Sequence, residues 1–287
     1  MVIDLHTHTT ASDGTDTPEQ LIAAAGAAGI DVLGVTDHDT TAGWDAAVRA
    51  RPSELSILRG AEFSCVYWES DQRRVGLHLL GYLFDPEEDS LRLARRELRA
   101  SRRERGRRMV ENMIADGLPI TWERVSELAE GGAVGRPHLG RALVEAGVVP
   151  DVGSAFGQLL SSRTKYYVRK TDLDVFAAIK LIRGAGGLTV FAHPLARRRG
   201  PVVDDAVIAK MADAGLVGLE VEHPDHDPAD RIHAAGLATE LNLVRTGSSD
   251  YHGTNKATPL GACTTSSEML ERLLAMPSAL QPVSGPR

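Results

Sequence analysis

The segment Val2-Ile-Asp-Leu-His-Thr-His8 sets the first constraint on the fold, because it is a short apolar strand that ends in two histidines. Side chains two residues apart in a strand point to the same side, so the two imidazoles share a face. Asp4 shares that face but lies deeper in the strand. A His-x-His pair alone is weak evidence for a metal site, so further candidate ligands must be found elsewhere in the chain.

Further short apolar runs follow this strand, with helical segments between them. The strands that we expect cover residues 2–5, 32–35, 55–58, 75–82, 188–192, 216–221 and 243–246. Thr17 as N-cap, Pro18 in the first turn and Gln20 as capping-box partner predict a helix after the first strand. Repeated strand–helix units predict an α/β fold with a parallel sheet, either a barrel or a doubly wound sheet.

The alternation stops between about residues 87 and 170, where helical segments separated by glycines are expected. Residues 90–170 hold 16 Lys and Arg against 9 Asp and Glu, whereas the rest of the chain is acidic. This contrast predicts a discontinuous α/β body of residues 1–88 and 171–270 with a helical, substrate-capping subdomain at 89–170. Residues 271–287 are expected to form a C-terminal tail, which should be loosely ordered after Met276.

The composition is that of an ordinary globular protein, with 287 residues, a hydrophobic fraction of 43% and a net charge of −7. No apolar run approaches the ~18–20 residues that cross a bilayer, and the N-terminus lacks the layout of a signal peptide. Cys65 and Cys263 are too few for a disulfide framework or a thiolate metal cage. We therefore expect a cytoplasmic protein, with no obligate protein partner implied.

Histidines and carboxylates recur at or near the predicted strands. Each could be a helix cap, a turn former or a core histidine, but their repeated placement favours a shared site, because ligands gather at the carboxyl ends of parallel strands. The nine candidates are His6, His8, Asp13, His38, Glu62, His78, His193, Asp250 and His252. Imidazole and carboxylate donors suit Mn, Zn or Fe, and nine of them predict two or three divalent ions with a bridging carboxylate. Such ions generate hydroxide from water and bind phosphoryl oxygens.

Seven segments resemble successive motifs of the polymerase-and-histidinol-phosphatase (PHP) family of metal-dependent phosphoesterases. They are Asp4-Leu-His-Thr-His8, Ser12-Asp-Gly14, Gly34-Val-Thr-Asp-His-Asp39, Gly60-Ala-Glu-Phe-Ser64, His78-Leu-Leu-Gly-Tyr82, Phe191-Ala-His-Pro194 and Gly247-Ser-Ser-Asp-Tyr-His252. The resemblance implies a distorted seven-stranded (β/α) TIM-like barrel with a trinuclear metal centre. It also implies three groups of ligands: His6, His8, Asp250 and Glu62; Glu62, His78 and His193; and Asp13, His38 and His252.

Two further segments narrow the subgroup. Gly135-Arg-Pro-His-Leu139 and Gly218-Leu-Glu-Val-Glu-His223 resemble members that hydrolyse 3′,5′-nucleotide bisphosphates and trim short RNA from its 5′ end. The resemblance implies a phosphatase in which a metal-held hydroxide converts adenosine 3′,5′-bisphosphate to AMP and phosphate. A 5′–3′ exonuclease on short RNA is the alternative, and a histidinol-phosphate phosphatase or a non-catalytic module is less favoured.

The candidate substrate-binding residues are Arg136, His138, Lys165, Arg197 and His223. Guanidinium groups bind phosphate oxygens bidentately, which favours Arg136 and one of the three arginines at 197–199, with Arg197 preferred. Arg136 could instead be a surface arginine at a helix start, and His223 could donate a proton to the leaving group or be a plain surface histidine. His226 and His233 are expected to be exposed. Nine arginines between residues 92 and 108 favour a solvated helix over a nucleic-acid surface.

Overall fold

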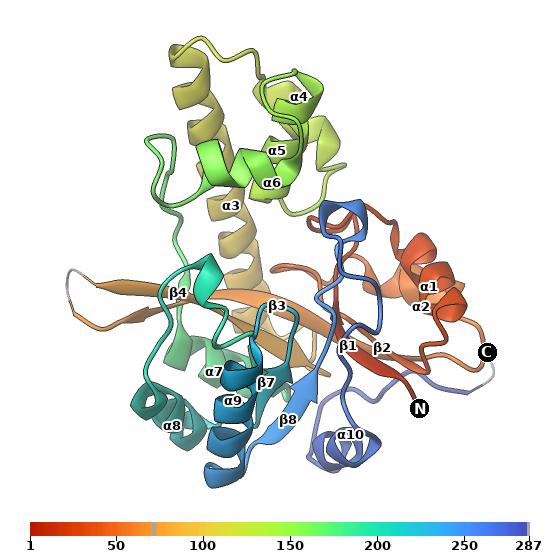
Figure 1. Cartoon of the computed structure of the whole chain (residues 1–287). Helices are drawn as coiled ribbons and strands as arrows, with labels where there is room; N and C mark the ends of the chain where they lie inside the picture. The colour runs from red at the N-terminus through yellow and green to blue at the C-terminus, as the bar shows by residue number, and fades with distance from the viewer. Residues whose placement is uncertain (71–72, 286–287) are drawn as a thin grey trace.

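The computed structural model describes residues 1–70 and 73–285, and its centre is a mixed sheet that closes almost into a barrel (Figure 1). The strands are β1 (Ile3–Thr7), β2 (Val32–Val35), β3 (Ser56–Trp68), β4 (Arg74–Tyr82), β5 (Leu173–Asp174), β6 (Leu188–Ala192), β7 (Gly218–Glu222) and β8 (Val244–Gly247). Seven of them follow the order β1-β2-β3-β4-β6-β7-β8, and β5 pairs with β3. A parallel bridge between Thr7 and Tyr251 links the two ends of this order. The expected TIM-like barrel is confirmed.

The expectation of a parallel sheet is wrong at β4, which runs antiparallel to both β3 and β6. Parallel neighbours need a crossover of a dozen or more residues, whereas only five residues separate Trp68 from Arg74. β3 is also much longer than the strand expected at 55–58, because it continues through Glu62 to Trp68. Glu62 therefore lies within a strand rather than after one, whereas His78 lies within β4 as expected.

Ten α-helices lie in the described part of the chain: α1 (Pro18–Ala27), α2 (Trp44–Ala50), α3 (Asp89–Ala115), α4 (Trp122–Leu128), α5 (Arg136–Glu145), α6 (Val152–Ala155), α7 (Val175–Gly184), α8 (Asp205–Ala214), α9 (Pro228–Glu240) and α10 (Ser267–Leu274). The capping box of α1 forms as predicted, since Thr17 and Gln20 exchange side-chain and backbone hydrogen bonds. A short π-helix, η1 (Phe156–Leu160), follows α6, and two 3-10 turns, η2 (Arg197–Arg199) and η3 (Gly253–Asn255), follow β6 and β8.

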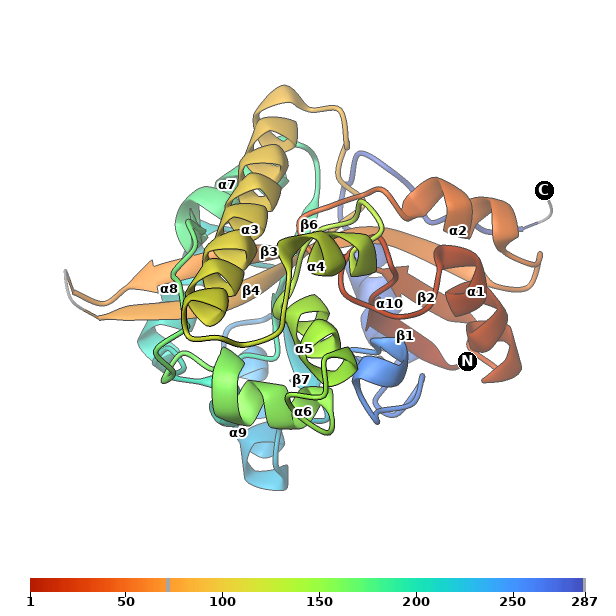
Figure 2. The ribbon, with the colours of Figure 1, turned by 90° about the horizontal axis from the view of Figure 1, so that it is seen from above.

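The helices of the insertion stand on one side of the barrel. α3 rises from beside the sheet, and α4, α5 and α6 lie around its far half (Figure 1). Seen from above, these helices lie over the central strands, whereas α1 and α2 flank β1 and β2 (Figure 2). The insertion has a hydrophobic cluster of its own, which includes Met109, Val125, Leu143 and Leu160. The boundaries of the three expected domains remain a prediction.

Two hydrophobic clusters stabilise the barrel. The larger one joins the sheet to the helices around it, and it takes Val75, Leu77 and Leu79 from one face of β4. The opposite face of β4 contributes Leu80 and Tyr82 to a second cluster, which also contains residues of α10. His78 shares the face of Leu80 and Tyr82, so the alternation of β4 separates a polar site from the main core.

The C-terminal segment is ordered along the barrel, so the expected loose tail is wrong for the described residues. Val283 pairs with Ile57 of β3, and Leu280 donates its backbone N–H to the carbonyl of Leu83. Residues 286–287 lie outside the described residues. None of the described helices has the length and apolar character needed to cross a membrane.

Candidate metal centre

The site forms where β1 ends inside the barrel. His6 lies in β1 and His8 follows it, and both side chains are fully buried. The backbone N–H of His8 donates to the carbonyl of Tyr251, which fixes the end of β1 beside the segment after β8. Asp4, deeper in the strand, accepts hydrogen bonds from the backbone of Ser249 and Gly261. Asp4 therefore anchors the loop that carries Asp250 and stays out of the ligand cluster.

All nine predicted ligands come together at this point. Three overlapping groups have donor atoms within 4.8 Å of one another: His6, His8, Glu62 and Asp250; His8, Asp13, His38 and His252; and His38, Glu62 and His78. The first group is the one expected. The second group contains His8 in addition to the expected Asp13, His38 and His252. The third group contains His38 in place of the expected His193, beside Glu62 and His78. Their roles as metal ligands remain a proposal.

Glu62 is the centre of the cluster. Each of its two oxygens faces imidazole nitrogens. Oε1 lies 2.6 Å from Nδ1 of His78 and 3.0 Å from Nε2 of His193. Oε2 lies 3.0 Å from Nδ1 of His38, 3.2 Å from Nε2 of His8 and 3.3 Å from Nε2 of His6. His193 thus approaches the same oxygen as His78. A carboxylate between two sets of imidazoles is the geometry expected of a bridging ligand.

Asp250 divides its two oxygens between the cluster and a set of cations. Oδ1 lies 3.3 Å from Nε2 of His8 and 3.5 Å from Nε2 of His6. Oδ2 accepts hydrogen bonds from Arg199 at 2.7 Å and from Lys256 at 2.5 Å. The two cations hold one oxygen of the carboxylate and leave the other facing the imidazoles.

The hydrogen bonds around His6 and His8 show that the cluster fits a metal ion. Their Nε2 atoms lie 3.1 Å apart. Nδ1 of His6 lies 3.1 Å from Glu220 Oε1, which can only accept, so Nδ1 carries the proton and Nε2 presents a lone pair. Nδ1 of His8 faces the hydroxyl of Ser12 at 3.4 Å. Two nitrogens turned toward each other and toward Glu62 and Asp250 require a shared cation or additional protons.

Other atoms of the cluster also lack hydrogen-bond partners within the described residues. Asp13 Oδ1, His38 Nδ1 and His78 Nδ1 are buried without one, although both nitrogens lie near Glu62. Buried polar atoms are rarely left unsatisfied in proteins, and each exception calls for an explanation such as an ion. Nitrogen and oxygen donors with unused lone pairs are the chemistry that Mn, Zn and Fe accept.

The group of His6, His8, Glu62 and Asp250, called the inner group below, carries charges that favour a bound cation. Burial alone would lower the pKa of His6, but the carboxylates of Glu62, Asp250 and Glu220 reverse this and hold the pKa well above its ordinary value. The pKa of His8 likewise rises to about 9 against burial, through hydrogen bonds with Asp250 and Glu62. The carboxylates therefore leave an excess of negative charge at this point, which divalent ions would neutralise in place of protons.

The outer group of Asp13, His38 and His252 differs, because burial favours the neutral form of its two imidazoles. Burial lowers the pKa of His38 to about 4 and that of His252 to about 4, although Asp13 acts in the opposite direction on both. Neutral imidazole is the form that binds a metal ion. Asp13 itself stays ionised, since His38 and His252 overcome the effect of burial and hold its pKa well below the usual range.

Backbone strain accompanies the site. Asp39, His193 and Asp250 have positive φ angles of 57°, 32° and 52°, which residues other than glycine rarely adopt. Such conformations cost about 1–3 kcal/mol each and persist where the surrounding structure fixes them, which is common at functional sites. At His193 and Asp250 the turn comes just after a strand, where each side chain faces the cluster.

Several buried residues that support the ligands were not predicted. Glu220 accepts from His6 and from the backbone N–H of His193, and Asp37 accepts from Thr9 and Ser12. In the segment that contains Glu220, we expected a role only for His223. Alternation in β7 could have indicated Glu220, because a charged residue at the centre of a buried strand needs a partner.

The structure brings Arg136 and His138 to the site from the insertion. Gly135, at the start of α5, packs directly on Asp13, because an added Cβ on Gly135 would lie 2.7 Å from Asp13 Oδ2. Nδ1 of His138 accepts the backbone N–H of Gly135, so this buried histidine caps the helix start. Arg136 follows at once and donates to the carbonyl of Leu160.

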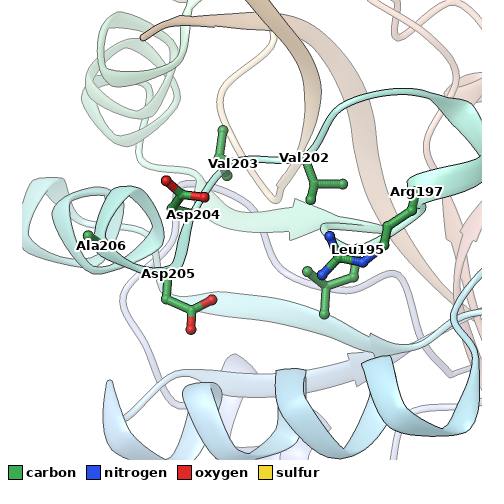
Figure 3. Close-up of a pocket in the computed structure, with 7 residues that line it drawn as sticks. All are labelled: Leu195, Arg197, Val202, Val203, Asp204, Asp205 and Ala206. Atoms are coloured by element: carbon green, nitrogen blue, oxygen red, sulfur yellow. The ribbon is translucent and has the colours of Figure 1, made fainter.

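His223 also lies in the site, but Lys165 and Arg197 do not. His223 is buried, and its Nε2 lies 3.3 Å from Asp250 Oδ2. Lys165 is exposed and pairs with Asp116 at the end of α3. Arg197 pairs with Asp230 and lines a separate surface pocket with Leu195, Val202, Val203, Asp204, Asp205 and Ala206 (Figure 3).

Arg199 lies in the site, two residues after the arginine that we preferred. η2 turns the chain so that Arg197 and Arg199 point to different places, and no local pattern in three consecutive arginines distinguishes them. The expectation for His226 is wrong, since it is buried between the carbonyl of Val221 and the N–H of Leu195. His233 is exposed as expected.

The arginines of α3 divide between two faces. Arg95, Arg102 and Arg105 are buried, so the expectation of a fully solvated helix is wrong for this face. Arg102 pairs with Asp39 and donates to Ser64. The exposed face carries the remaining arginines of the series except the half-buried Arg99, namely Arg92, Arg96, Arg103, Arg107 and Arg108.

Comparison with known proteins agrees with this geometry. The PHP domain family matches residues 4–115. The 5′-3′ exoribonuclease Rnm of Salmonella typhimurium is 33% identical over 88% of this chain and 85% of its own. The 3′,5′-nucleoside bisphosphate phosphatase of Chromobacterium violaceum is 32% identical over 87% of both chains. The phosphoribosyl 1,2-cyclic phosphate 1,2-diphosphodiesterase of Eggerthella lenta is 32% identical over 88% of this chain and 95% of its own.

Two solved structures share the whole fold. One, from Bifidobacterium adolescentis and assigned to the metal-dependent phosphoesterases, is 35% identical, covers 95% of both chains and has a TM-score of 0.89. The other, an amidohydrolase from Chromobacterium violaceum with bound sulfate and no metal, is 28% identical, covers 96% of both chains and has a TM-score of 0.84.

Proposed function

The chain belongs to the PHP domain family, and we propose that it is a metal-dependent phosphoesterase that removes the 3′ phosphate from nucleoside 3′,5′-bisphosphates. Adenosine 3′,5′-bisphosphate would yield AMP and phosphate. The observation that carries the proposal is the start of α5, where Gly135 packs against Asp13 and Arg136 is the next residue. A metal-binding cluster and a guanidinium from the insertion would thus face the same substrate.

The metal centre would hold two or three divalent ions of Mn, Zn or Fe. The inner group of His6, His8, Glu62 and Asp250 would hold one, and Glu62 would bridge it to a second held by His78 and His193. The third would lie between Asp13, His38 and His252, with His8 within reach. When bound, such ions lower the pKa of water and neutralise charge on phosphoryl oxygens.

Residues of this chain would orient the substrate and supply a proton. Nδ1 of His223 accepts the backbone N–H of Asp225, so the ring proton lies on Nε2, which faces Asp250. A proton on this nitrogen could pass to the leaving oxygen at the edge of the cluster. Arg136 would bind the phosphate group that is not hydrolysed, because its guanidinium makes no ion pair with a carboxylate of the described residues.

A 5′–3′ exonuclease acting on short RNA is the second candidate, and the exposed arginines of α3 favour it. The Salmonella relative is named for that activity. Arg107 and Arg108 both lie near Glu104, however, and Arg92 pairs with Asp89, so part of this positive charge is neutralised. We therefore place the mononucleotide first. Because the relative from Eggerthella lenta is named for a cyclic phosphate substrate, a cyclic phosphate diester should also be assayed.

Phosphate release by the manganese-loaded protein tests the proposal. Adenosine 3′,5′-bisphosphate should be hydrolysed faster than histidinol phosphate, a 5′-phosphorylated RNA trimer or a ribosyl cyclic phosphate. A preference for histidinol phosphate would overturn the substrate. A preference for the trimer with a steep dependence on salt would favour the exonuclease, since polyanion binding weakens as salt rises.

A non-catalytic module would bind no transition metal and hydrolyse none of these substrates. Elemental analysis of the purified protein, followed by assay after metal loading, separates this case from an enzyme. We also propose a cytoplasmic location, which a fluorescent fusion would test.

A further inference from the structure

Arg105 lies on the buried face of α3 without a partner. Its side chain is 6% exposed, and it makes no hydrogen bond or ion pair with any residue that the structure describes. Nε is fully buried and has no hydrogen-bond partner. The terminal nitrogens also lack a partner, but they are not fully buried. The guanidinium therefore reaches solvent at its tip only.

The other inward-facing arginines of α3 are all engaged. Arg95 donates to Thr41 and the carbonyl of Pro86, Arg99 donates to the carbonyl of Asp39, and Arg102 pairs with the Asp39 carboxylate. These bonds attach the helix to the barrel. Arg105 lies one turn beyond Arg102, and among the inward-facing arginines of α3 it alone forms no hydrogen bond or ion pair with the described residues.

A second guanidinium that forms no ion pair within the described residues lies near Arg105. Arg136 begins α5, which packs against α3, and its guanidinium stacks over Phe156 and Tyr167. Burial, together with the charges of Arg136 and Arg102, lowers the pKa of Arg105 to about 9. The Asp13 carboxylate acts on both arginines from a distance, but neither forms an ion pair with it.

A buried cation beside a half-buried one, with neither in an ion pair, is unfavourable, because a charge withdrawn from water has lost hydration without compensation. A bound anion would remove this cost, because it would pair with both guanidinium groups. The anion would lie between the insertion and the barrel, on the side of the cluster where Gly135 contacts Asp13. Forked guanidinium groups match the oxygens of a phosphate group.

We propose that Arg105 and Arg136 together form a pocket for the second phosphate group of the substrate, and that Arg105 makes the enzyme select substrates with two phosphate groups. This inference rests on the proposed function, since it assumes that another phosphate group occupies the metal cluster. It assigns to Arg105 a role in specificity rather than in the reaction itself.

Arg105→Gln tests the pocket, with Arg108→Gln as control because Arg108 is an exposed arginine one turn away. Each protein is assayed with adenosine 3′,5′-bisphosphate and with adenosine 3′-monophosphate. Arg105→Gln should lower kcat/KM for the bisphosphate roughly ten- to a hundredfold and leave the monophosphate nearly unchanged. An equal loss on both substrates, or no loss on either, would overturn the proposal.

Binding of AMP, measured by calorimetry on the manganese-loaded protein, separates this inference from the proposed function. AMP retains only the 5′ phosphate, so its affinity should fall roughly tenfold or more in Arg105→Gln and in Arg136→Gln. If AMP binding depends on these arginines while no bisphosphate is hydrolysed, the pocket stands and the proposed function fails. AMP binding that is unchanged in both variants, with unfolding temperatures equal to that of the parent, would refute the pocket.

Discussion

Glu220 and His6 form a hydrogen bond inside the barrel, with Oε1 of Glu220 3.1 Å from Nδ1 of His6 and both side chains fully buried. The other oxygen of Glu220 accepts the backbone N–H of His193 at 2.7 Å. One carboxylate thus orients two residues of the cluster. It also fixes the tautomer of His6, so that the lone pair of Nε2 is directed at Glu62 and Asp250.

Glu220→Gln should weaken metal binding about 10- to 100-fold, because the amide keeps the shape but loses the charge that raises the basicity of the His6 imidazole. Competition with a chelator gives the dissociation constants. Glu222→Gln is the matched control, since Glu222 lies on the same strand but is half exposed and pairs with Arg231. Equal metal affinity in the two variants would contradict the role of Glu220.

Gly135→Ala should disturb the outer group of ligands. The new methyl would lie 2.7 Å from Asp13 Oδ2 and 3.0 Å from its Cβ, and buried Asp13 has little room to move. We expect one ion fewer per protein by elemental analysis and a fall in kcat/KM on the order of tenfold or more, because displacements near 1 Å can cost a hundredfold. Gly157→Ala, where an added Cβ meets nothing within 4 Å, should retain both. Full metal content in Gly135→Ala would argue against the contact.

Local sequence was sufficient for most of the elements and for the convergence of the nine candidate residues. The capping residues Thr17 and Gln20 predicted a helix start that the structure reproduces. His6, His8 and His193 follow buried apolar runs, so their convergence could be inferred from the common edge of neighbouring strands. This inference needs only the direction of each strand and not its detailed register.

Long-range pairing was the part that local sequence could not predict. Glu62 and His78 meet because β3 and β4 pair antiparallel, with Ser64 opposite His78. The length of β3 and this register depend on contacts between distant residues. In the same way, the burial of Arg102 depends on which face of α3 meets Asp39, and a helix with arginine on all sides gives no indication of that face.

Arg199→Gln should impair the enzyme, whereas Arg197→Gln should not. Arg199 donates to Asp250 Oδ2 and also pairs with Asp225, so its loss removes a charge that helps to hold a ligand. We expect kcat/KM to fall roughly tenfold to a hundredfold, in line with one charge-assisted hydrogen bond. Arg197 is exposed and pairs with Asp230 outside the cluster. The two variants are assayed in parallel, and equal losses would contradict the difference between the two arginines.

Removal of metal should destabilise the folded protein, because it leaves the Nε2 atoms of His6 and His8 facing each other at 3.1 Å between carboxylates. An ion present at a thousand times its dissociation constant stabilises by about 4 kcal/mol, since it binds the folded state alone. For a domain of this size that corresponds to a loss of roughly 10 °C in Tm on chelation. Thermal unfolding with and without chelator measures the shift, and added manganese should restore it. Glu62→Gln, which removes the charge of the carboxylate that we propose as the bridge, should show a much smaller shift than the parent protein. If Tm stays constant while elemental analysis shows that the ions are gone, the cluster is not held together by metal.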